Sequence, residues 1–249
     1  TGDVILGAEA GASGEVDAHG VDTVLEVIGD ITAGNAGSGA INLSDGAAVT
    51  AGDLFLGTLS DASGFLTLLG DEGLPPSLIL SGTLSAGGAG EATLTLSNGA
   101  QLQVLGDMLC GFLPGSTCTG LFAGAAGSEE SPLPEFIRWT VRDEMVFGSG
   151  GEGIIAVTNA ALTETSAMRL GVESTGTGVY SVSGLTSVTN IAGELAIAEA
   201  GRGTVTMKDT ASINAGALVL GKSVGGLGVL RLFTGSQLTV AMLDSGKED

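Results

Sequence analysis

A short strand-like phrase recurs along this chain at a fixed interval of 25 residues. The phrase reads GEVDAH, GAINLS and GFLTLL near the start of the chain, and GVYSVS, GTVTMK and GVLRLF near its end. Apolar residues alternate with other residues in each phrase, which is typical of a β-strand with one buried face. A fixed period of this length indicates a repeat architecture, in which each unit stacks on the next. The repeat therefore predicts an elongated stack of coils rather than a compact domain.

Each repeat unit contains three short strands. The first starts with an acidic or small residue and ends at glycine, as in DVILG at 3–7 and DLFLG at 53–57. The alternating phrase follows, and a turn rich in Asn, Asp and Gly then leads to a third strand. Nine such openings predict an all-β fold, a parallel β-solenoid with about nine three-strand coils of about 25 residues. We expect one domain over residues 1–249, forming a rod about 43 Å long at roughly 4.8 Å per coil.

The alternation also predicts which side chains face the interior. Stacked coils pair equivalent strands in parallel, so equivalent side chains form columns in the core. On the second strand we expect one interior column of Val16, Ile41, Leu66, Leu94, Ile155, Tyr180, Val205 and Leu230. On the third strand we expect the equivalent positions to be Val49, Leu102 and Val104, Val188, Ile213, and Leu238 and Val240.

One coil, at about residues 107–143, departs from the period. We interpret it as a coil with a loop of about a dozen extra residues around 123–135, followed by the strand FIRWTV. A short helix at 135–144 is the competing interpretation. Insertions in solenoids usually project from one face, where they can contact partners. The sequence therefore predicts one loop insertion in the middle of the rod.

The single tryptophan of the chain lies beside this insertion. Trp139 is flanked by Arg138 and Arg142, and the three residues form a candidate contact patch for a partner. The alternative is that the arginines pair with nearby Asp143 or Glu135.

Two cysteines lie in the phrase CGFLPGSTC. Proline and glycine between Cys110 and Cys118 can fold the chain back, so we predict a disulfide that closes a small loop. A disulfide indicates an oxidising, extracytoplasmic setting. The alternative is a pair of unpaired thiols in the core. The spacing and the lack of nearby partners do not fit a metal site of the CxxC type.

The charge of the chain is strongly negative. The 28 acidic and 8 basic residues give a formal net charge of -20. Nucleic acid is excluded as a partner because phosphate binding needs a Lys/Arg surface. No stretch has the 18 or more apolar residues of a membrane span, so no membrane insertion is expected.

Acidic residues recur at the opening of the coils. The positions that share this place are Asp3, Asp30, Asp53, Asp107, Glu144 and Glu194. Stacked carboxylates repel one another, and bound calcium could relieve the repulsion, with Asp30 and Asp53 as candidate ligands. However, the glycine-rich Asp nonapeptide of calcium-binding β-rolls is absent. We therefore favour a turn-capping role for these carboxylates, and expect no cofactor.

The sequence contains no convincing catalytic group. His19 is the only histidine and lies next to a predicted corner, and no serine occupies a Gly-x-Ser-x-Gly phrase between a strand and a helix. Neighbouring carboxylates such as Asp71 and Glu72 do not form the converging pair that sugar hydrolysis needs. One Trp and one Tyr are too few for an aromatic sugar platform. We therefore expect a protein that is not an enzyme.

Two longer phrases, LSDGAAVTAGDLFLG and MKDTASINAGALVLG, join the turn to the next opening. They resemble the β-strand repeats of autotransporter passenger regions and of PEP-CTERM-associated surface proteins of Gram-negative bacteria. The likeness covers most of the chain apart from the middle insertion. It implies a β-solenoid and a secreted or cell-surface location on a Gram-negative bacterium.

Three functions are compatible with this sequence. The first is an extracellular structural protein whose subunits stack head to tail into a filament or layer, because neither end shows a capping helix. In that hypothesis the subunit ends present Val4, Leu6, Leu238 and Val240 to the next copy. The second is a monomeric adhesin fragment that binds a surface or matrix ligand through the middle loop. The third is a carbohydrate-active β-helix enzyme.

Overall fold

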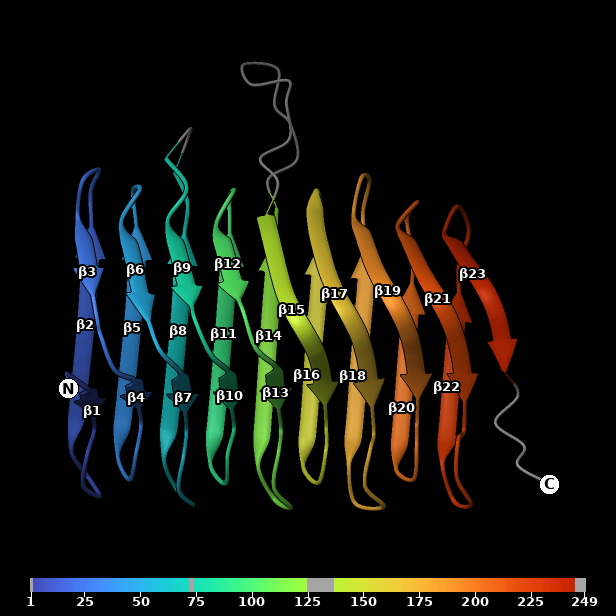
Figure 1. Ribbon diagram of the computed structural model, residues 1–249, viewed down its shortest axis with the longest axis horizontal. Coiled ribbons are helices and arrows are strands. Elements are labelled where there is room, and N and C mark those ends of the chain that lie inside the picture. The colour runs from blue at the N-terminus through green and yellow to red at the C-terminus, as the bar shows by residue number, and fades with distance from the viewer. Residues whose placement is uncertain (1, 72–73, 125–136, 245–249) are drawn as a thin grey trace.

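The computed structural model describes residues 2–71, 74–124 and 137–244, and these form a β-solenoid of about nine coils (Figure 1). The described residues form 23 strands, and every paired strand runs parallel to its partner one coil away. No helix occurs in the described ranges. Figure 1 shows the coils side by side from the N-terminal end, in blue, to the C-terminal end, in red. The predicted fold class is thereby confirmed.

The second strands of the coils form a continuous nine-stranded sheet. Its members, in spatial order, are β2 (Ser13–His19), β5 (Ser38–Ser44), β8 (Ser63–Leu69), β11 (Glu91–Ser97), β14 (Thr117–Ala123), β16 (Glu152–Thr158), β18 (Thr177–Ser183), β20 (Arg202–Met207) and β22 (Leu227–Leu232).

The first and third strands are separate in the N-terminal coils. The first strands are β1 (Val4–Leu6), β4 (Ile31–Ala33), β7 (Leu54–Leu56), β10 (Leu84–Ala86) and β13 (Met108–Cys110). The third strands are β3 (Val24–Glu26), β6 (Ala48–Ala51), β9 (Ser77–Leu80) and β12 (Gln101–Val104). A corner divides each third strand from the first strand of the next coil.

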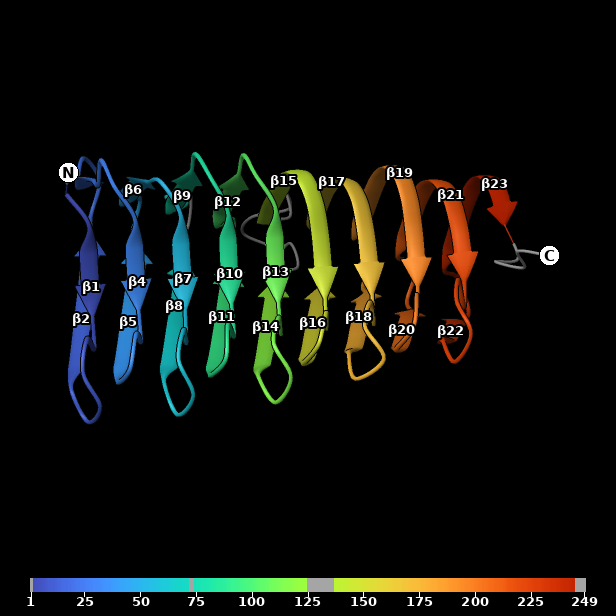
Figure 2. The ribbon, with the colours of Figure 1, turned by 60° about the horizontal axis from the view of Figure 1, so that its bottom comes forward.

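In the C-terminal half this corner is replaced by a bend within one long strand (Figure 2). The start of β15 pairs with β12, and its end pairs with β13, so the two columns of strands merge there. The long strands are β15 (Ile137–Phe147), β17 (Ala161–Leu170), β19 (Val188–Ile197), β21 (Ser212–Leu220) and β23 (Gln237–Asp244). Together with the separate strands, they make up the second, 14-stranded sheet.

The predicted interior column on the second strands lies in strict register. Pairing runs without a break from Val16 through Ile41 and Leu66 to Tyr180, Val205 and Leu230. A ninth member, Gly120, stands between Leu94 and Ile155 and was not predicted. A Cβ on Gly120 would clash with the Ile155 side chain, so the larger neighbour fills the gap left by the glycine.

Glycine at the end of the first strand is required by the turn. Gly34 has a φ of +75°, a left-handed conformation that side chains with a Cβ rarely adopt. A Cβ at this position would also clash with the carbonyl oxygen of Ser63 in the next coil. The recurring glycine of the opening phrase thus allows successive coils to approach closely.

Large aromatic side chains gather where the two types of coil meet. The Trp139 ring packs edge-on against Phe122, with ring centroids 4.4 Å apart, and lies 6.2 Å from Phe147. Phe147 in turn stacks on Tyr180 at 5.9 Å. All four side chains are fully buried. This cluster fills the interior at the first of the long bent strands.

The prediction for the third strand is wrong at Val188. The residue that faces inward is its neighbour Thr189, which pairs in register with Thr163 on one side and Ile213 on the other. A polar residue is tolerated here because the Tyr180 hydroxyl lies 2.6 Å from the Thr189 hydroxyl, within hydrogen-bond distance. Burial raises the pKa of Tyr180 to about 12, although the hydrogen bond to Thr189 acts in the opposite direction.

The middle insertion lies mostly outside the described residues. β14 ends at Ala123 and β15 begins at Ile137, so the predicted loop around 123–135 falls largely in the segment that is not described. The helix considered at 135–144 is wrong, because residues 137–147 form a strand that pairs on both sides.

Candidate functional site

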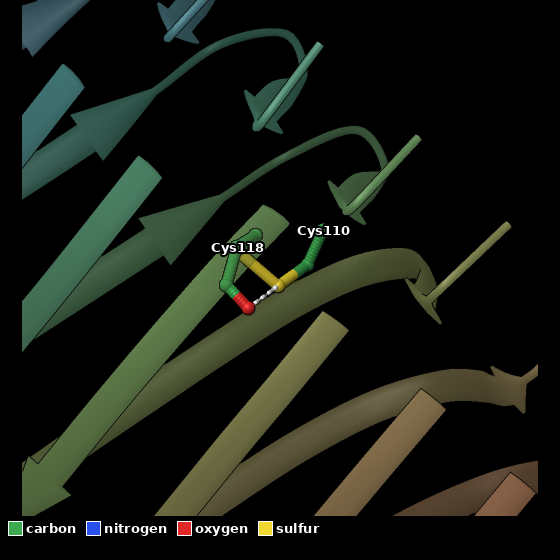
Figure 3. Close-up of a disulfide and its surroundings, with 2 residues drawn as sticks. All are labelled: Cys110 and Cys118. Atoms are coloured by element: carbon green, nitrogen blue, oxygen red, sulfur yellow. Dashed lines mark hydrogen bonds between the residues drawn. A yellow bond between two sulfur atoms is a disulfide. The ribbon is translucent and has the colours of Figure 1, made fainter. Parts of the chain in front are cut away.

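The two cysteines form a disulfide inside the solenoid (Figure 3). Cys110 ends β13 and Cys118 lies in β14, and their Cα atoms are 5.3 Å apart. Both residues are buried in the core, so the bond links the first and second strands of one coil. It occupies positions that apolar side chains hold in neighbouring coils, since Cys110 pairs with Ala86 and Phe147.

Removing the disulfide should weaken this coil without unfolding the rod. For the double variant Cys110→Ala/Cys118→Ala we expect a free energy of unfolding lower by about 2–3 kcal/mol, because the closed loop is short. Urea unfolding followed by circular dichroism measures this change. In the parent, alkylation without reductant should add no mass even after denaturation. Free thiols in oxidised, natively purified protein would contradict the bond.

The acidic openings of the N-terminal coils cap backbone amides of the next coil. Asp3 Oδ1 accepts from the amide of Asp30 at 3.1 Å, and Asp30 Oδ1 accepts from the amide of Asp53 at 2.8 Å. Asp53 Oδ1 continues the series with the amide of Thr83 at 2.6 Å. Gly52 makes room for one of these carboxylates, because a Cβ there would clash with Asp30 Oδ1. The carboxylates therefore connect successive coils.

This capping geometry agrees with the turn-capping role expected for Asp30 and Asp53. One oxygen of each carboxylate already accepts a backbone hydrogen bond. Among the described residues, no group of three or more His, Cys, Asp or Glu side chains is arranged to hold a metal ion. Calcium takes six to eight oxygen ligands, more than these two carboxylates supply by themselves.

Replacing Asp30 with alanine tests the cap. We expect a free energy of unfolding lower by about 1–3 kcal/mol, because the partly buried amide of Asp53 loses its acceptor. Asp17→Ala, an exposed position on β2, is the matched control and should change it by less than about 0.5 kcal/mol. Thermal unfolding with and without calcium adds the second readout. A calcium-dependent rise in Tm that is lost in Asp30→Ala would instead identify a metal site.

In the C-terminal coils the acidic openings are paired with cations. Arg169 Nη1 lies 3.4 Å from Glu144 Oε2, and the Arg169 guanidinium also pairs with Glu199. Lys222 Nζ lies 3.2 Å from Glu194 Oε1 and 3.4 Å from Glu199 Oε1. Burial alone would raise the pKa of Glu199, but the hydrogen bond and charge of Arg169, together with Lys222, lower it overall. This ladder of ion pairs crosses several coils on the outer surface.

The predicted contact patch is wrong for Trp139. The side chain is buried in the core, because it pairs in register with inward-facing Leu102. Arg138 and Arg142 are exposed, as alternation along β15 requires. Neither arginine forms an ion pair with a described residue, and Glu135 lies outside the described residues.

The described residues assemble no catalytic constellation that we recognise. His19 is exposed at the end of β2, where its backbone carbonyl oxygen accepts a hydrogen bond from the Thr23 hydroxyl. The phrase GKSVG at 221–225 matches the Gly-x-Ser-x-Gly pattern of a nucleophile elbow. However, it lies in a turn between two strands rather than between a strand and a helix, and Lys222 belongs to the ion-pair ladder.

The two ends of the described solenoid have open sheet edges. β1, β2 and β3 each pair with a strand on one side only, and so do β22 and β23. Val4, Leu6, Leu238 and Val240 are only partly buried, whereas equivalent residues of inner coils are fully buried. Apolar side chains are also exposed on the last coil, including Phe233 at 52% and Met242 at 63%.

Comparison with known protein families, with curated proteins and with solved structures finds no match to this chain. Helices able to span a membrane are not found among the described residues. Function therefore has to be inferred from the residues and their geometry.

Proposed function

We propose that this chain is a non-enzymatic structural protein of the cell surface or extracellular space, whose β-solenoid subunits stack head to tail. The supporting observation is that, among the described residues, the same interior columns are open at both ends of the solenoid. Val16 and Leu230 are the two ends of one column, and each is only half-buried. Leu25 and Leu238 are likewise the two ends of a column formed by the third strands, and both are only partly buried. A second copy placed one coil further along would continue these columns.

The physical driving force is the pairing of free edges. An open edge presents unpaired amide and carbonyl groups, which readily accept another strand. A head-to-tail contact is heterologous and does not close, so it produces a filament rather than a ring of fixed size. The buried disulfide supports a location outside the reducing cytosol.

The end of β23 sets a condition for stacking. Met242 pairs with Ala217, so this half of the strand already occupies the first-strand position of the next coil. The β1 strand of a stacked copy belongs at that same position. Either residues 242–244 or the incoming β1 must therefore be displaced when two copies join. Stacking with displacement is expected to nucleate slowly and then to grow.

The test is assembly of residues 1–249 as a function of concentration. Sedimentation velocity and negative-stain electron microscopy should reveal filaments one solenoid wide that appear after a lag. Removal of residues 242–249 should shorten the lag, because one of the competing strands is gone. Isolated rods at all concentrations, for both the parent and the shortened chain, would overturn the proposal.

A further inference from the structure

A groove of about 550 Å³ runs along the C-terminal half of the rod, where the long strands bend. Its lining comes from equivalent positions on β15, β17, β19, β21 and β23. Each strand contributes up to three consecutive residues to the groove, and equivalent residues of successive strands form three rows along the rod. The first residue is polar and points outward, the second lies at the bend, and the third follows it. Asn190, Ile191 and Ala192 of β19 illustrate the three rows. The volume lies in the range of ordinary ligand sites.

The outward row is polar in every coil that lines the groove. Register places its members in one line, namely Thr140, Glu164, Asn190, Asn214 and Thr239. The Asn214 amide donates to Asn190 Oδ1 at 3.0 Å, which holds the two side chains side by side. Each asparagine keeps further hydrogen-bonding capacity, since an amide offers two donors and two acceptor sites. In the adjoining row Val141, Ile191 and Ala215 point into the core, and the row beyond it includes the exposed Ala192 and Ala241.

β-bulges shape the other side of the groove. In β15 the two residues Arg142 and Asp143 stand opposite Ser166 alone, and β19 has a similar extra residue relative to β21. The Asp143 carbonyl accepts the hydroxyls of both Thr165, at 3.0 Å, and Ser166. Bulges of this kind bend a strand and redirect side chains. Hydroxyl groups of β17 therefore hold the bulged backbone of β15 in place.

We propose that this groove binds an extended, neutral, β-linked polysaccharide along the rod axis. The main chain cannot recognise a peptide by strand addition here, because β15, β17, β19 and β21 are each paired on both sides. Recognition is left to hydroxyl, amide and carboxylate side chains, which match the hydroxyl groups of sugars. The exposed alanines Ala192 and Ala241 add a small apolar surface for the C–H faces of the sugar rings.

Charge and spacing select among polysaccharides. The groove lining carries one carboxylate, Glu164, and one guanidinium, Arg142, while the net charge of -20 of the whole chain disfavours an anionic polysaccharide. Equivalent side chains repeat at roughly 4.8 Å along the axis, the distance between parallel strands. One sugar unit of an extended β-linked glycan advances by a similar distance. Each coil of the groove thus faces about one sugar.

Affinity electrophoresis and calorimetry with two probes, cellohexaose and β-1,4-mannohexaose, test this site. We expect measurable binding of at least one probe to the parent, and no binding of hexagalacturonate, which is anionic. The variant Asn190→Leu/Asn214→Leu should bind at least tenfold more weakly, because it removes the paired amides. Ala192→Trp, which fills the groove at an exposed position, should do the same.

The matched control is Asn42→Leu, an outward asparagine on β5 of the other sheet. It should bind the probes as the parent does. Circular dichroism and thermal unfolding identify variants that remain folded. One groove variant removes hydrogen-bonding groups and the other fills the groove, so a variant that remains folded still tests the site if the other does not fold. The site is wrong if neither probe binds, if hexagalacturonate binds equally well, or if Asn42→Leu weakens binding as much as the groove variants do.

Discussion

Replacement of Trp139 with alanine is expected to lower the free energy of unfolding by about 3–5 kcal/mol, the usual cost of removing a large aromatic side chain from a core. Only 1% of Trp139 is exposed, and its ring contacts Phe122 and lies close to Phe147. Its indole N–H has no hydrogen-bond partner among the described residues, so the loss comes from packing. Urea unfolding followed by far-ultraviolet circular dichroism measures the effect.

Two matched variants define what that result means. Arg138→Ala changes the exposed neighbour and should alter the free energy of unfolding by less than about 0.5 kcal/mol. Trp139→Phe keeps an aromatic ring in the cluster and should cost clearly less than the alanine variant. If Trp139→Ala and Arg138→Ala were equally mild, Trp139 would not be a core residue, and the contact patch would have to be reconsidered.

The interior of the solenoid could largely be predicted from the repeat. Each coil contacts only its neighbours, so a column follows once the period and the inward face of one strand are known. Gly120 could not be predicted as a member of the interior column, because a glycine carries no apolar side chain to mark an inward position. Its place becomes visible only through pairing with Leu94 and Ile155.

The two wrong assignments on the third strand had different causes. A tryptophan between two arginines is typical of a contact site, but alternation in FIRWTV points Trp139 inward with Ile137 and Val141. Val188 is apolar, which favours an inward position. The inward residue is instead Thr189, and only the buried Tyr180 hydroxyl explains why a threonine is acceptable there.

The surface features depend on contacts between coils that the sequence does not mark. Arg169 and Glu199 are 30 residues apart, and Arg169 and Glu144 are 25 apart. The insertion interrupts the period between Ala123 and Ile137, so register across it cannot be counted from the sequence. The groove depends on bulges in β15 and β19, which change register without any distinctive residue.

Replacement of Leu238 with lysine is expected to abolish filament growth at the C-terminal end. Leu238 lies on β23, packs partly against the core and is the last described member of its column. An inward-pointing charge at an open edge is a common means by which proteins prevent further strand addition. In the single rod the ammonium group can reach water through the open end. In a stacked copy it would be buried against Leu25 without a partner, which is strongly unfavourable.

The control for this prediction is Thr239→Lys, which places the same charge one residue further on the outward face of β23. This variant should assemble as the parent does, in electron micrographs and by sedimentation. Leu25→Lys at the opposite end provides an independent test, because head-to-tail growth needs both surfaces. Each blocked variant still has one open end, so adding it to the parent should shorten filaments in proportion to its fraction. If the Leu238→Lys and Leu25→Lys variants, each tested alone, both form filaments of normal length, copies do not join through these ends.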